Sequence, residues 1–453
     1  MSLEQAAVAM NGTLAGADLN FVGVSTDTRN LQPGELFFAL KGENFDGHDL
    51  CREAAELGAA AAVVDKDIEQ CLATVRVVDT RFALGDLAKS WRSEHKVRVV
   101  GVTGSNGKTT VKEMVASILN QQGSVLSTTG NFNNEIGLPK TLFALQDTHE
   151  YAVIEMGANH IGEISRLASI AKPDVAIITL CAPAHLEGFG SIEGVAQAKG
   201  EIYESLPDQG VAILNADDKF KPYWERIIGD RNVITFGMDS VHANVTATNI
   251  RPQGLGEGTQ FNLHYQGRVT AVRIPHDGSH NVMNALAASA AGIALGCDES
   301  VIGRGLAGSG IAAGRLNISQ LGQRVKLIDD TYNANPTSLL AASRVAAMGS
   351  GKTWVVLGDM AELGEDGEIL HAQCAREMRA IGINKLFTVG ELAAAAAEAF
   401  GENAASFDSK DHLLSAVLGE LNADTNSSFT ILVKGSRAMK METLVRALQE
   451  SSL

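Results

Sequence analysis

Cysteines are few in this sequence, and no run of apolar residues is long enough to span a membrane. The five cysteines lie far apart and include no C-x-x-C pair, which argues against both a disulfide framework and a zinc site. The opening residues contain no basic segment followed by an apolar one, so we expect neither a signal peptide nor a membrane anchor. Together these absences predict a protein of the reducing cytoplasm.

Basic residues are also scarce, because 37 lysines and arginines stand against 53 aspartates and glutamates. The formal net charge of −16 and the lack of any basic block make nucleic acid a poor partner. A small anionic ligand can still bind, because its binding depends on nearby cations and Mg²⁺ and not on the net charge of the whole protein. At 453 residues, 45% of them apolar, the chain is long enough for roughly three domains of about 150 residues each.

The most informative stretch covers residues 98–121. A short β-forming segment ends in the loop Gly104-Ser105-Asn106-Gly107, and Lys108, Thr109 and Thr110 then open a helical pattern. Glycines let backbone N–H groups converge on anionic oxygens, and a helix start adds partial positive charge. A lysine at this place reaches terminal phosphates, and the following hydroxyl ligates a phosphate-bound Mg²⁺. The stretch therefore predicts a polyphosphate site.

The spacing of this loop is shorter than the usual G-x4-G-K-[ST] pattern, because Val102 stands where the first glycine would be. We therefore predict a shortened variant of the P-loop. A glycine-rich turn that only links a strand to a helix is the structural alternative. The lysine and the two threonines beside the glycines favour the phosphate site.

Strand and helix signals alternate along the chain in three blocks, which predicts an α/β fold with three domains. Residues 1–83 form a small N-terminal α/β module, and residues 84–312 a central P-loop domain, ATPase-like, with a parallel sheet. Residues 313–453 form a C-terminal Rossmann-like domain. Near-continuous apolar strands predict helices on both faces of each parallel sheet, with ligands at the carboxyl ends of the strands.

Two candidate residues follow strands of the central block. Glu155 ends a mostly apolar strand, where a carboxylate needs a partner, and it suits the Mg²⁺ that P-loop enzymes bind on a neighbouring strand. His185 follows the next strand, and taken alone it is as well explained as an ordinary loop residue.

Lys199 lies on an apolar stripe of a predicted helix, between Val195 and Ile202. Burial lowers the pKa of a lysine, and a neutral amine can react with CO₂ to give a carbamate, an anion suited to a metal. The alternative is a lysine at the edge of the stripe whose ammonium reaches water. The helical pattern alone leaves these two explanations equal.

Further polar residues could complete a nucleotide site. Asn281 and Asn284 share the first turn of a predicted helix, where their amides could read the edge of a purine, although capping by Ser279 or Asn281 also explains them. In the C-terminal block, polar loops follow three strands and suggest a site that faces the nucleotide, although each residue alone is more often a solvated loop residue. These loop residues are Arg315, Asp330, Asn333, Asn335, Lys434 and Arg437.

Taken together, these motifs resemble the Mur ligase family of peptidoglycan precursor synthesis over the whole chain. The shortened loop at 104–110 is similar to the P-loop of that family. Glu155 in Glu-Met-Gly, His185 in His-Leu-Glu, Lys199 in Ala-Lys-Gly and the turn at 280–284 follow in the family's order. The chain departs from the pattern at 180–182, where Leu-Cys-Ala replaces the usual Asn-x-Gly.

The resemblance implies a set of ligands and roles. Thr109, Glu155 and His185 would hold two Mg²⁺ ions, with Lys199 carbamylated beside them. Lys108, His185 and Lys199 would serve catalysis. The residues implied in ATP binding are Gly104, Ser105, Asn106, Gly107, Lys108, Thr109, Thr110, Asn281, Asn284, Arg315 and Asp330.

Within the family, residues 131–139, 330–336, 357–364 and 434–442 resemble the member that adds D-alanyl-D-alanine to UDP-N-acetylmuramoyl-tripeptide. The resemblance implies an ATP-dependent, ADP-forming ligase that works through an acyl phosphate and has these two molecules as substrates. We expect it to act as a monomer. The UDP-sugar would contact Thr26, Thr28, Glu43, Asn44 and Phe45. The dipeptide would contact Lys434 and Arg437.

Three other functions stay open on the sequence. Another ligase of the family, such as a folylpolyglutamate synthase, would share most of these motifs. A kinase or NTPase would make no amide and would not need an inward lysine or a third domain. A catalytically silent nucleotide-binding protein would not need Lys108, Glu155 and Lys199 together.

Overall fold

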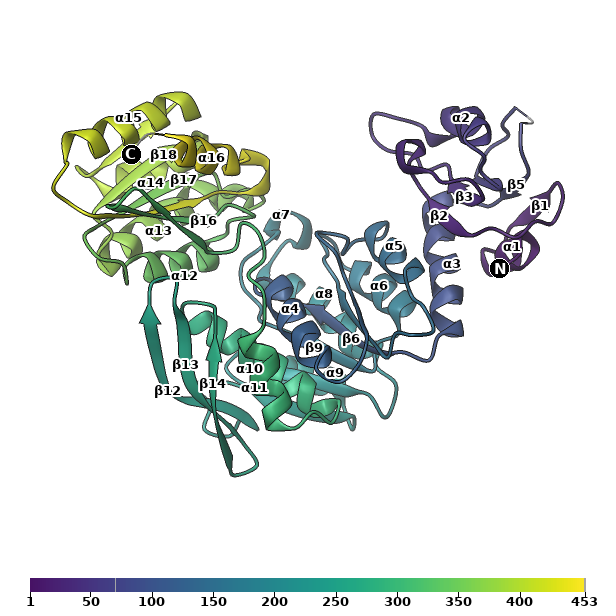
Figure 1. Ribbon diagram of the computed structural model, residues 1–453, viewed down its shortest axis with the longest axis horizontal. Helices are drawn as coiled ribbons and strands as arrows, with labels where there is room; N and C mark the ends of the chain where they lie inside the picture. The colour runs from purple at the N-terminus through teal and green to yellow at the C-terminus, as the bar shows by residue number, and fades with distance from the viewer. Residues whose placement is uncertain (70, 452–453) are drawn as a thin grey trace. The chain divides into compact units, whose positions relative to one another are not determined.

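The computed structural model describes residues 1–69 and 71–451 of the chain, which form two compact units. The first unit comprises Met1–Gly101, Gly123–Ala158 and Glu163–Asp174. The second comprises Val102–Gln122, Asn159–Gly162 and Val175–Leu453. Three β-sheets with helices between their strands confirm the predicted α/β class (Figure 1).

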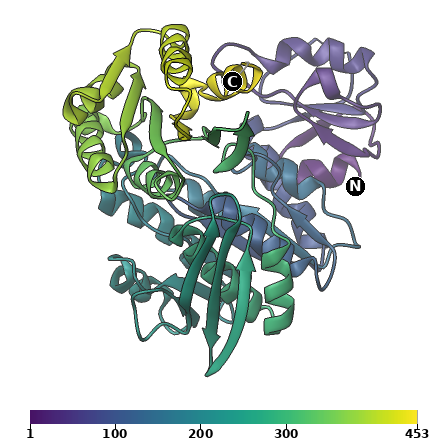
Figure 2. The ribbon, with the colours of Figure 1, turned by 60° about the vertical axis from the view of Figure 1, so that its left-hand side comes forward.

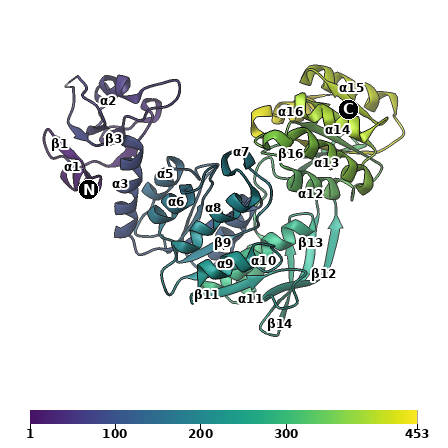
Figure 3. The same cartoon turned by 180° about the vertical axis from the view of Figure 1, so that it is seen from behind.

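The N-terminal sheet has the strand order β1-β5-β4-β3-β2, and only the β1–β5 pair is antiparallel. Side chains of β3 and β4 alternate between the two faces, as strand geometry requires. Phe38 and Val63 pack with α1 and α3, whereas Phe37 and Val64 pack with α2 on the opposite face (Figure 3). The elements are α1 (Leu3–Ala9), β1 (Thr13–Ala15), β2 (Gly23–Ser25), η1 (Thr28–Asn30), β3 (Glu35–Phe38), η2 (Gly47–Leu50), α2 (Cys51–Glu56), β4 (Ala61–Val64), β5 (Thr74–Arg76) and α3 (Thr80–Glu94).

The central sheet has nine strands in the order β14-β13-β12-β11-β10-β9-β6-β8-β7. Strands β9 and β10 are almost wholly apolar and buried, which is typical of a parallel strand covered on both faces. Its elements up to β10 are β6 (Arg98–Thr103), α4 (Lys108–Leu119), β7 (Val125–Ser127), α5 (Gly137–Phe143), β8 (Tyr151–Glu155), α6 (Glu163–Ala171), β9 (Val175–Ile178), α7 (Leu186–Phe189), α8 (Ile192–Glu204) and β10 (Val211–Asn215).

The prediction of a wholly parallel central sheet is wrong at one end. Strands β12, β13 and β14 form antiparallel pairs, which Figure 2 shows as three long strands in teal and green. Their outer faces are exposed, so the strands carry polar residues and even a proline, Pro252, and they lack the apolar run by which the other strands were recognised. The elements are α9 (Lys221–Ile228), β11 (Asn232–Phe236), β12 (Val245–Gly254), β13 (Gly258–Tyr265), β14 (Arg268–Ile274), α10 (Ser279–Ala294) and α11 (Glu299–Ala307).

The C-terminal sheet has the order β15-β16-β20-β17-β18-β19, parallel except for β15. Helices α12, α13 and α14 cover one face, and α15 and α16 cover the other. This doubly wound arrangement places the ends of β16 and β20 side by side. The elements are β15 (Asn317–Leu321), β16 (Val325–Asp330), α12 (Pro336–Ala346), β17 (Lys352–Gly358), η3 (Gly364–Asp366), α13 (Gly367–Ile381), β18 (Lys385–Val389), α14 (Glu391–Phe400), β19 (Ala404–Phe407), α15 (Lys410–Ala423), β20 (Phe429–Lys434), η4 (Arg437–Met439) and α16 (Glu442–Glu450).

The domain boundaries proposed from the sequence stay predictions. The boundary at 83/84 falls within α3, and the boundary at 312/313 falls between α11 and β15. Within residues 1–69 and 71–451, none of the helices combines the length and the apolar character that crossing a bilayer requires.

Candidate active site

The phosphate loop follows β6, and its backbone conformation and close neighbours require glycine at two positions. Gly104 has φ +146°, and a Cβ atom on it would lie 1.8 Å from Thr179 Oγ1. Gly107 has φ +81°, and a Cβ atom there would lie 2.4 Å from Asn284 Oδ1. Neither position tolerates a side chain, because both the backbone conformation and the available space exclude one.

Hydrogen bonds to the segment after β9, and one within the loop itself, hold the loop in place. Thr179 Oγ1 donates to the Asn106 carbonyl at 2.6 Å, and Ser105 Oγ donates to the Ala182 carbonyl at 2.9 Å. Lys108 Nζ donates to the Gly104 carbonyl at 2.8 Å, so its ammonium group lies over the loop. The loop is therefore a fixed structure and more than a flexible link.

The loop leads into α4 without a side-chain cap, because the N-cap residue is Gly107. Backbone N–H groups in the first helical turn have no partners within the helix, and together with the helix dipole they attract anions. Thr109 and Thr110 lie in this turn, half-buried. The geometry suits a phosphate, although the individual roles of these residues stay predictions.

Lys199 is buried on α8, with 3% of its surface exposed, as its position on the apolar stripe indicated. Its Nζ lies 5.7 Å from the centre of the Phe189 ring. Burial lowers the pKa of Lys199 to about 7, and repulsion from Lys108 adds to the effect. An amine with this pKa is partly neutral near pH 7, which carbamate formation requires.

His185 is the N-cap residue of α7 and has the left-handed conformation, with φ +52°. Its Nδ1 lies 2.5 Å from Glu362 Oε2, a carboxylate on the loop after β17. Burial lowers the pKa of His185, Glu362 opposes this, and Lys108 and Lys199 add to it. The sequence prediction did not include Glu362, whose own backbone is also left-handed, with φ +61°.

Glu155 ends β8 in the first unit and is 2% exposed. Its Oε1 accepts a hydrogen bond from Asn133 Nδ2 at 2.7 Å, whereas its Oε2 has no partner among the described residues. A buried carboxylate oxygen without a partner is costly unless a cation compensates it. Such an oxygen and the Thr109 hydroxyl are hard donors that fit Mg²⁺.

In the part of the chain that the structure describes, no three His, Cys, Asp or Glu side chains come together as a ready metal site. The donors predicted from the sequence include a threonine hydroxyl and a modified lysine. The absence of a His, Cys, Asp or Glu cluster among the described residues therefore says nothing about these donors, and the predicted Mg²⁺ ligands stay a prediction.

A cavity of about 560 Å³ in the second unit brings most of the predicted ATP residues together. Its walls come from the phosphate loop, from β12 and α10, and from α12 and the C-terminal sheet. Apolar side chains such as Met283 and Val345 line much of it, which suits the faces of a nucleotide base. The predicted residues that line it are Asn106, Gly107, Thr110, Asn281, Asn284, Arg315 and Asp330.

The two asparagines of α10 are bonded to each other and to the preceding turn. Asn284 Nδ2 donates to Asn281 Oδ1 at 3.0 Å, and Asn281 Nδ2 donates to the Asp277 carbonyl at 2.8 Å. Neither asparagine caps the helix, because the N-cap residue is Gly278. Helix capping therefore does not explain why asparagines occur at these two positions, and their contact with adenine stays a prediction.

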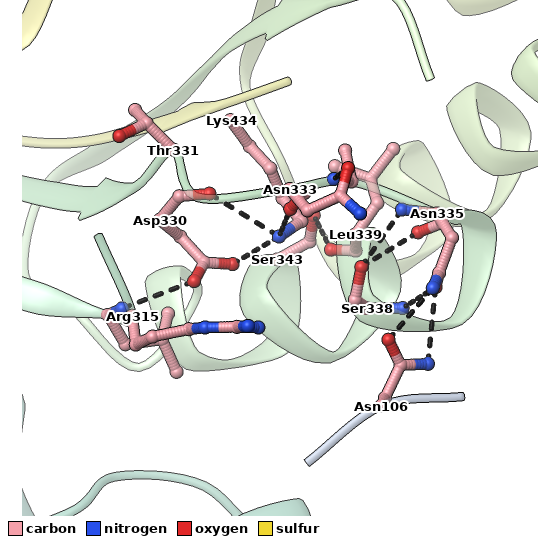
Figure 4. A network of polar contacts seen from close by, with 12 residues as sticks. Asn106, Arg315, Asp330, Thr331, Asn333, Asn335, Ser338, Leu339, Ser343 and Lys434 are labelled. Atoms are coloured by element: carbon pink, nitrogen blue, oxygen red, sulfur yellow. Dashed lines mark hydrogen bonds and ion pairs between the residues drawn. The ribbon is translucent and has the colours of Figure 1, made fainter. Parts of the chain in front are cut away.

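A polar network lies at the ends of β16 and β20, which are paired in register at Asp330 and Lys434 (Figure 4). Lys434 Nζ lies 2.5 Å from Asp330 Oδ2 and donates to the Asn333 carbonyl at 2.9 Å. The guanidinium of Arg315 lies 4.2 Å from the Tyr332 ring centre, and its Nε has no hydrogen-bond partner among the described residues. Lys434 lines the cavity that also contains the predicted ATP residues, although the resemblance assigned Lys434 to the dipeptide.

The remaining predicted residues lie at other strand ends. Arg437 follows β20 and is exposed, with an ion pair to Glu442 at 3.4 Å. Strands β2 and β3 are parallel neighbours, so the loops that follow them lie at the same edge of the N-terminal sheet. These loops carry Thr26, Thr28, Glu43, Asn44 and Phe45.

The sequence prediction missed two histidines. His276 and His280 line the same cavity of about 560 Å³, and burial lowers the pKa of each to about 4. They therefore stay neutral near pH 7. The sequence pattern shows a polar turn before α10, but it does not show that His276 is buried and His280 half-buried in the wall of this cavity.

A short phosphate loop, an inward lysine and a cavity with a wall from a Rossmann-like sheet are the features that the resemblance to a ligase family implied. The Mur ligase middle domain matches residues 102–292, the Mur ligase glutamate ligase domain matches residues 314–437, and the Mur ligase family catalytic domain matches residues 20–92. The chain belongs to the Mur ligase family.

Several relatives carry the same activity in their names. The UDP-N-acetylmuramoyl-tripeptide–D-alanyl-D-alanine ligase of Escherichia coli (strain K12) is 44% identical over 451 residues, which cover 100% of this chain and 99% of that one. A crystal structure of MurF from Acinetobacter baumannii has a TM-score of 0.94 at 36% identity, covering 99% of this chain and 98% of that one.

A third relative was crystallised with a nucleotide. The structure of MurF ligase from Thermotoga maritima in complex with ADP has a TM-score of 0.85 at 26% identity. The match covers 96% of this chain and 99% of that one.

Proposed function

We propose that this protein is an ATP-dependent, ADP-forming ligase of peptidoglycan precursor synthesis. It joins D-alanyl-D-alanine to the C-terminal carboxylate of UDP-N-acetylmuramoyl-tripeptide. One observation carries the proposal: the phosphate loop, Asn281, Arg315 and Asp330 line one cavity, in a chain similar along its whole length to ligases named for this reaction. We further propose that it acts in the cytoplasm and as a monomer.

Amide formation from a carboxylate and an amine is unfavourable in water, so the carboxylate is first converted to an acyl phosphate by ATP. The loop N–H groups and the start of α4 bind the nucleotide phosphates, and Lys108 neutralises the charge that spreads over the transferring phosphoryl group. The amine of D-alanyl-D-alanine then attacks the acyl phosphate and releases phosphate.

Mg²⁺, when bound, would bring the two anionic reactants together by neutralising both. We propose that Thr109, Glu155, His185 and a carbamylated Lys199 hold it. The unpartnered Oε2 of Glu155 and the near-neutral pKa of Lys199, about 7, support this set.

The other substrates have candidate sites at strand ends. We propose that the UDP-sugar contacts the loops after β2 and β3, and that Lys434 and Arg437 bind the dipeptide carboxylate. Arg437 is the more available of the two, because its guanidinium is exposed, whereas the ammonium of Lys434 is held by Asp330. Charge reversal at Arg437 is expected to raise the KM for the dipeptide selectively.

An ADP-release assay tests the proposal. Purified protein with Mg²⁺, ATP, UDP-N-acetylmuramoyl-tripeptide and D-alanyl-D-alanine is expected to form ADP and a new amide, detected by mass spectrometry. Omission of the dipeptide should stop net turnover, and a panel of UDP-peptides identifies the preferred third residue of the acceptor. ADP formed at the full rate without a new peptide bond would contradict the ligase and favour an NTPase.

A variant of the phosphate loop links that activity to this site. Lys108→Ala is expected to lower kcat by about 10²–10³-fold, because one preorganised cationic donor to the transferring phosphoryl group is lost. Unchanged kcat in this variant would place the chemistry elsewhere.

A further inference from the structure

Two asparagines that are far apart in the sequence pair their side-chain amides. Asn335 Nδ2 donates to Asn106 Oδ1 at 2.8 Å, and Asn106 Nδ2 donates to Asn335 Oδ1 at 3.2 Å (Figure 4). The pair is reciprocal, so it fixes the orientation of both amides. It joins the phosphate loop to the first turn of α12, which covers the C-terminal sheet.

Asn335 is itself held firmly. It is 8% exposed and is the N-cap of α12, where its Oδ1 also accepts from the Ser338 N–H at 2.9 Å. Ser338 Oγ in turn accepts from the Asn335 N–H at 3.0 Å, which completes a capping box, and Pro336 fixes the first helical position. The amide that Asn335 presents to the loop is thus a rigid one.

Asn106 lies at the point where the phosphate loop enters α4, so fixing its side chain also fixes the backbone there. It immediately precedes Gly107, the N-cap of α4, and its carbonyl accepts from Thr179 Oγ1 at 2.6 Å. With its side chain and its carbonyl both held, the peptide groups that lead into α4 keep one orientation. Those groups carry the N–H donors that would face the nucleotide phosphates.

We propose that Asn335 is a positioning residue for nucleotide binding, which holds the phosphate loop in its binding conformation through the side chain of Asn106. The inference rests on the proposed function, because it takes the loop as the phosphate site of a nucleotide. Preorganisation of this kind increases affinity, since the loop is already ordered before the ligand arrives.

The substitution Asn335→Ser tests the proposal. Serine is also a good N-cap, so α12 keeps its capping hydrogen bond, but the side chain is too short to reach Asn106. Loss of two amide hydrogen bonds is expected to raise the Kd for ADP by about tenfold in isothermal titration calorimetry, with little change in the melting temperature. An unchanged Kd would overturn the proposal.

A double variant distinguishes a positioning role of Asn335 from a general structural role. If Asn335 acts through Asn106, then Asn335→Ser should change the Kd for ADP no further in a protein that already carries Asn106→Ala. If the two effects multiply, Asn335 acts independently of Asn106 and the proposal fails. This comparison holds even if each single variant is somewhat less stable.

Ser409→Ala is a matched control. Ser409 caps α15 by accepting from the His412 N–H at 3.3 Å, on the opposite face of the C-terminal sheet from α12. Its loss is expected to lower stability and leave the Kd for ADP unchanged, whereas a tenfold rise here as well would attribute the Asn335 effect to helix capping. Wild-type protein that does not bind ADP would refute the proposed function, which is a separate outcome.

Discussion

Lys199 and Lys434 are among the almost fully buried lysines of the second unit, and they differ in what faces their ammonium groups. Lys434, 2% exposed, lies at the end of β20 beside Asp330, and it also donates to the Asn333 carbonyl. Lys199, 3% exposed, lies on α8 near the Phe189 ring and is repelled by Lys108. Burial lowers the pKa of both lysines, but only Lys434 has a carboxylate that opposes the shift.

This difference indicates two different tasks. A carboxylate 2.5 Å from a buried lysine stabilises the charged form, and here it also links the ends of two strands. Lys199 has no such carboxylate among the described residues, so burial and repulsion from Lys108 favour its neutral amine. The surroundings of Lys434 thus suit a structural ion pair, and those of Lys199 are compatible with the proposed carbamate.

The largest expected effect follows from removing Lys199. Lys199→Ala is expected to lower ligase kcat by about 10³-fold or more, because the anion proposed to bind Mg²⁺ is lost. The free energy of unfolding should stay unchanged or rise, since no ion pair is broken. Partial rescue of ADP formation by short carboxylates would support the carbamate, and full activity of Lys199→Ala would remove Lys199 from the mechanism.

The opposite pattern is expected at the other lysine. Lys434→Met should lower the free energy of unfolding by about 3–5 kcal/mol, because Asp330 is left buried without its cation. Urea unfolding measures the change. The double variant Lys434→Met/Asp330→Asn should regain part of the loss, and failure to regain any would mean that the ion pair is not the cause.

Acid is expected to lower the free energy of unfolding through His280, which interacts electrostatically with Lys434 and Asp330. Burial lowers the pKa of His280 from 6.5 to about 4; Asp330 opposes the shift, and Lys434 and His276 add to it. Between pH 6.5 and 4 the unfolded chain therefore binds more protons at this site, so stability falls as the pH falls, by about 1.4 kcal/mol for each pH unit. The variant His280→Gln should lose this part of the pH dependence in urea titrations, and an identical pH profile would contradict the prediction.

The smallest expected effect concerns the helix that carries Lys199. Ser191 caps α8, where its Oγ accepts from the Gly194 N–H at 3.1 Å. Ser191→Ala should cost about 1 kcal/mol in urea unfolding, whereas Ser191→Asp should keep the cap and the stability. Equal losses in both variants would show that the cap does not stabilise this helix.

Local features of the site could be predicted well from the sequence. The phosphate loop is a contiguous run of residues. Apolar neighbours at helical spacing on α8 left a buried Lys199 as one of two equal explanations, and the structure favours it. Strands β12 to β14 were missed because their polar outer faces give no continuous apolar run. The pairing of Asn106 with Asn335 joins residues 229 positions apart, and no spacing rule connects them.

The sequence by itself determined the α/β class, the glycine-rich loop that leads into a helix, and the apolar stripe that carries Lys199. These properties depend on residues that are neighbours along the chain. The tertiary structure decided that Lys434 is paired with Asp330, that His185 meets Glu362, and that Asn335 holds the phosphate loop. Each of these contacts depends on strand order and helix packing, which bring distant residues within hydrogen-bonding distance and set the charge of the buried groups.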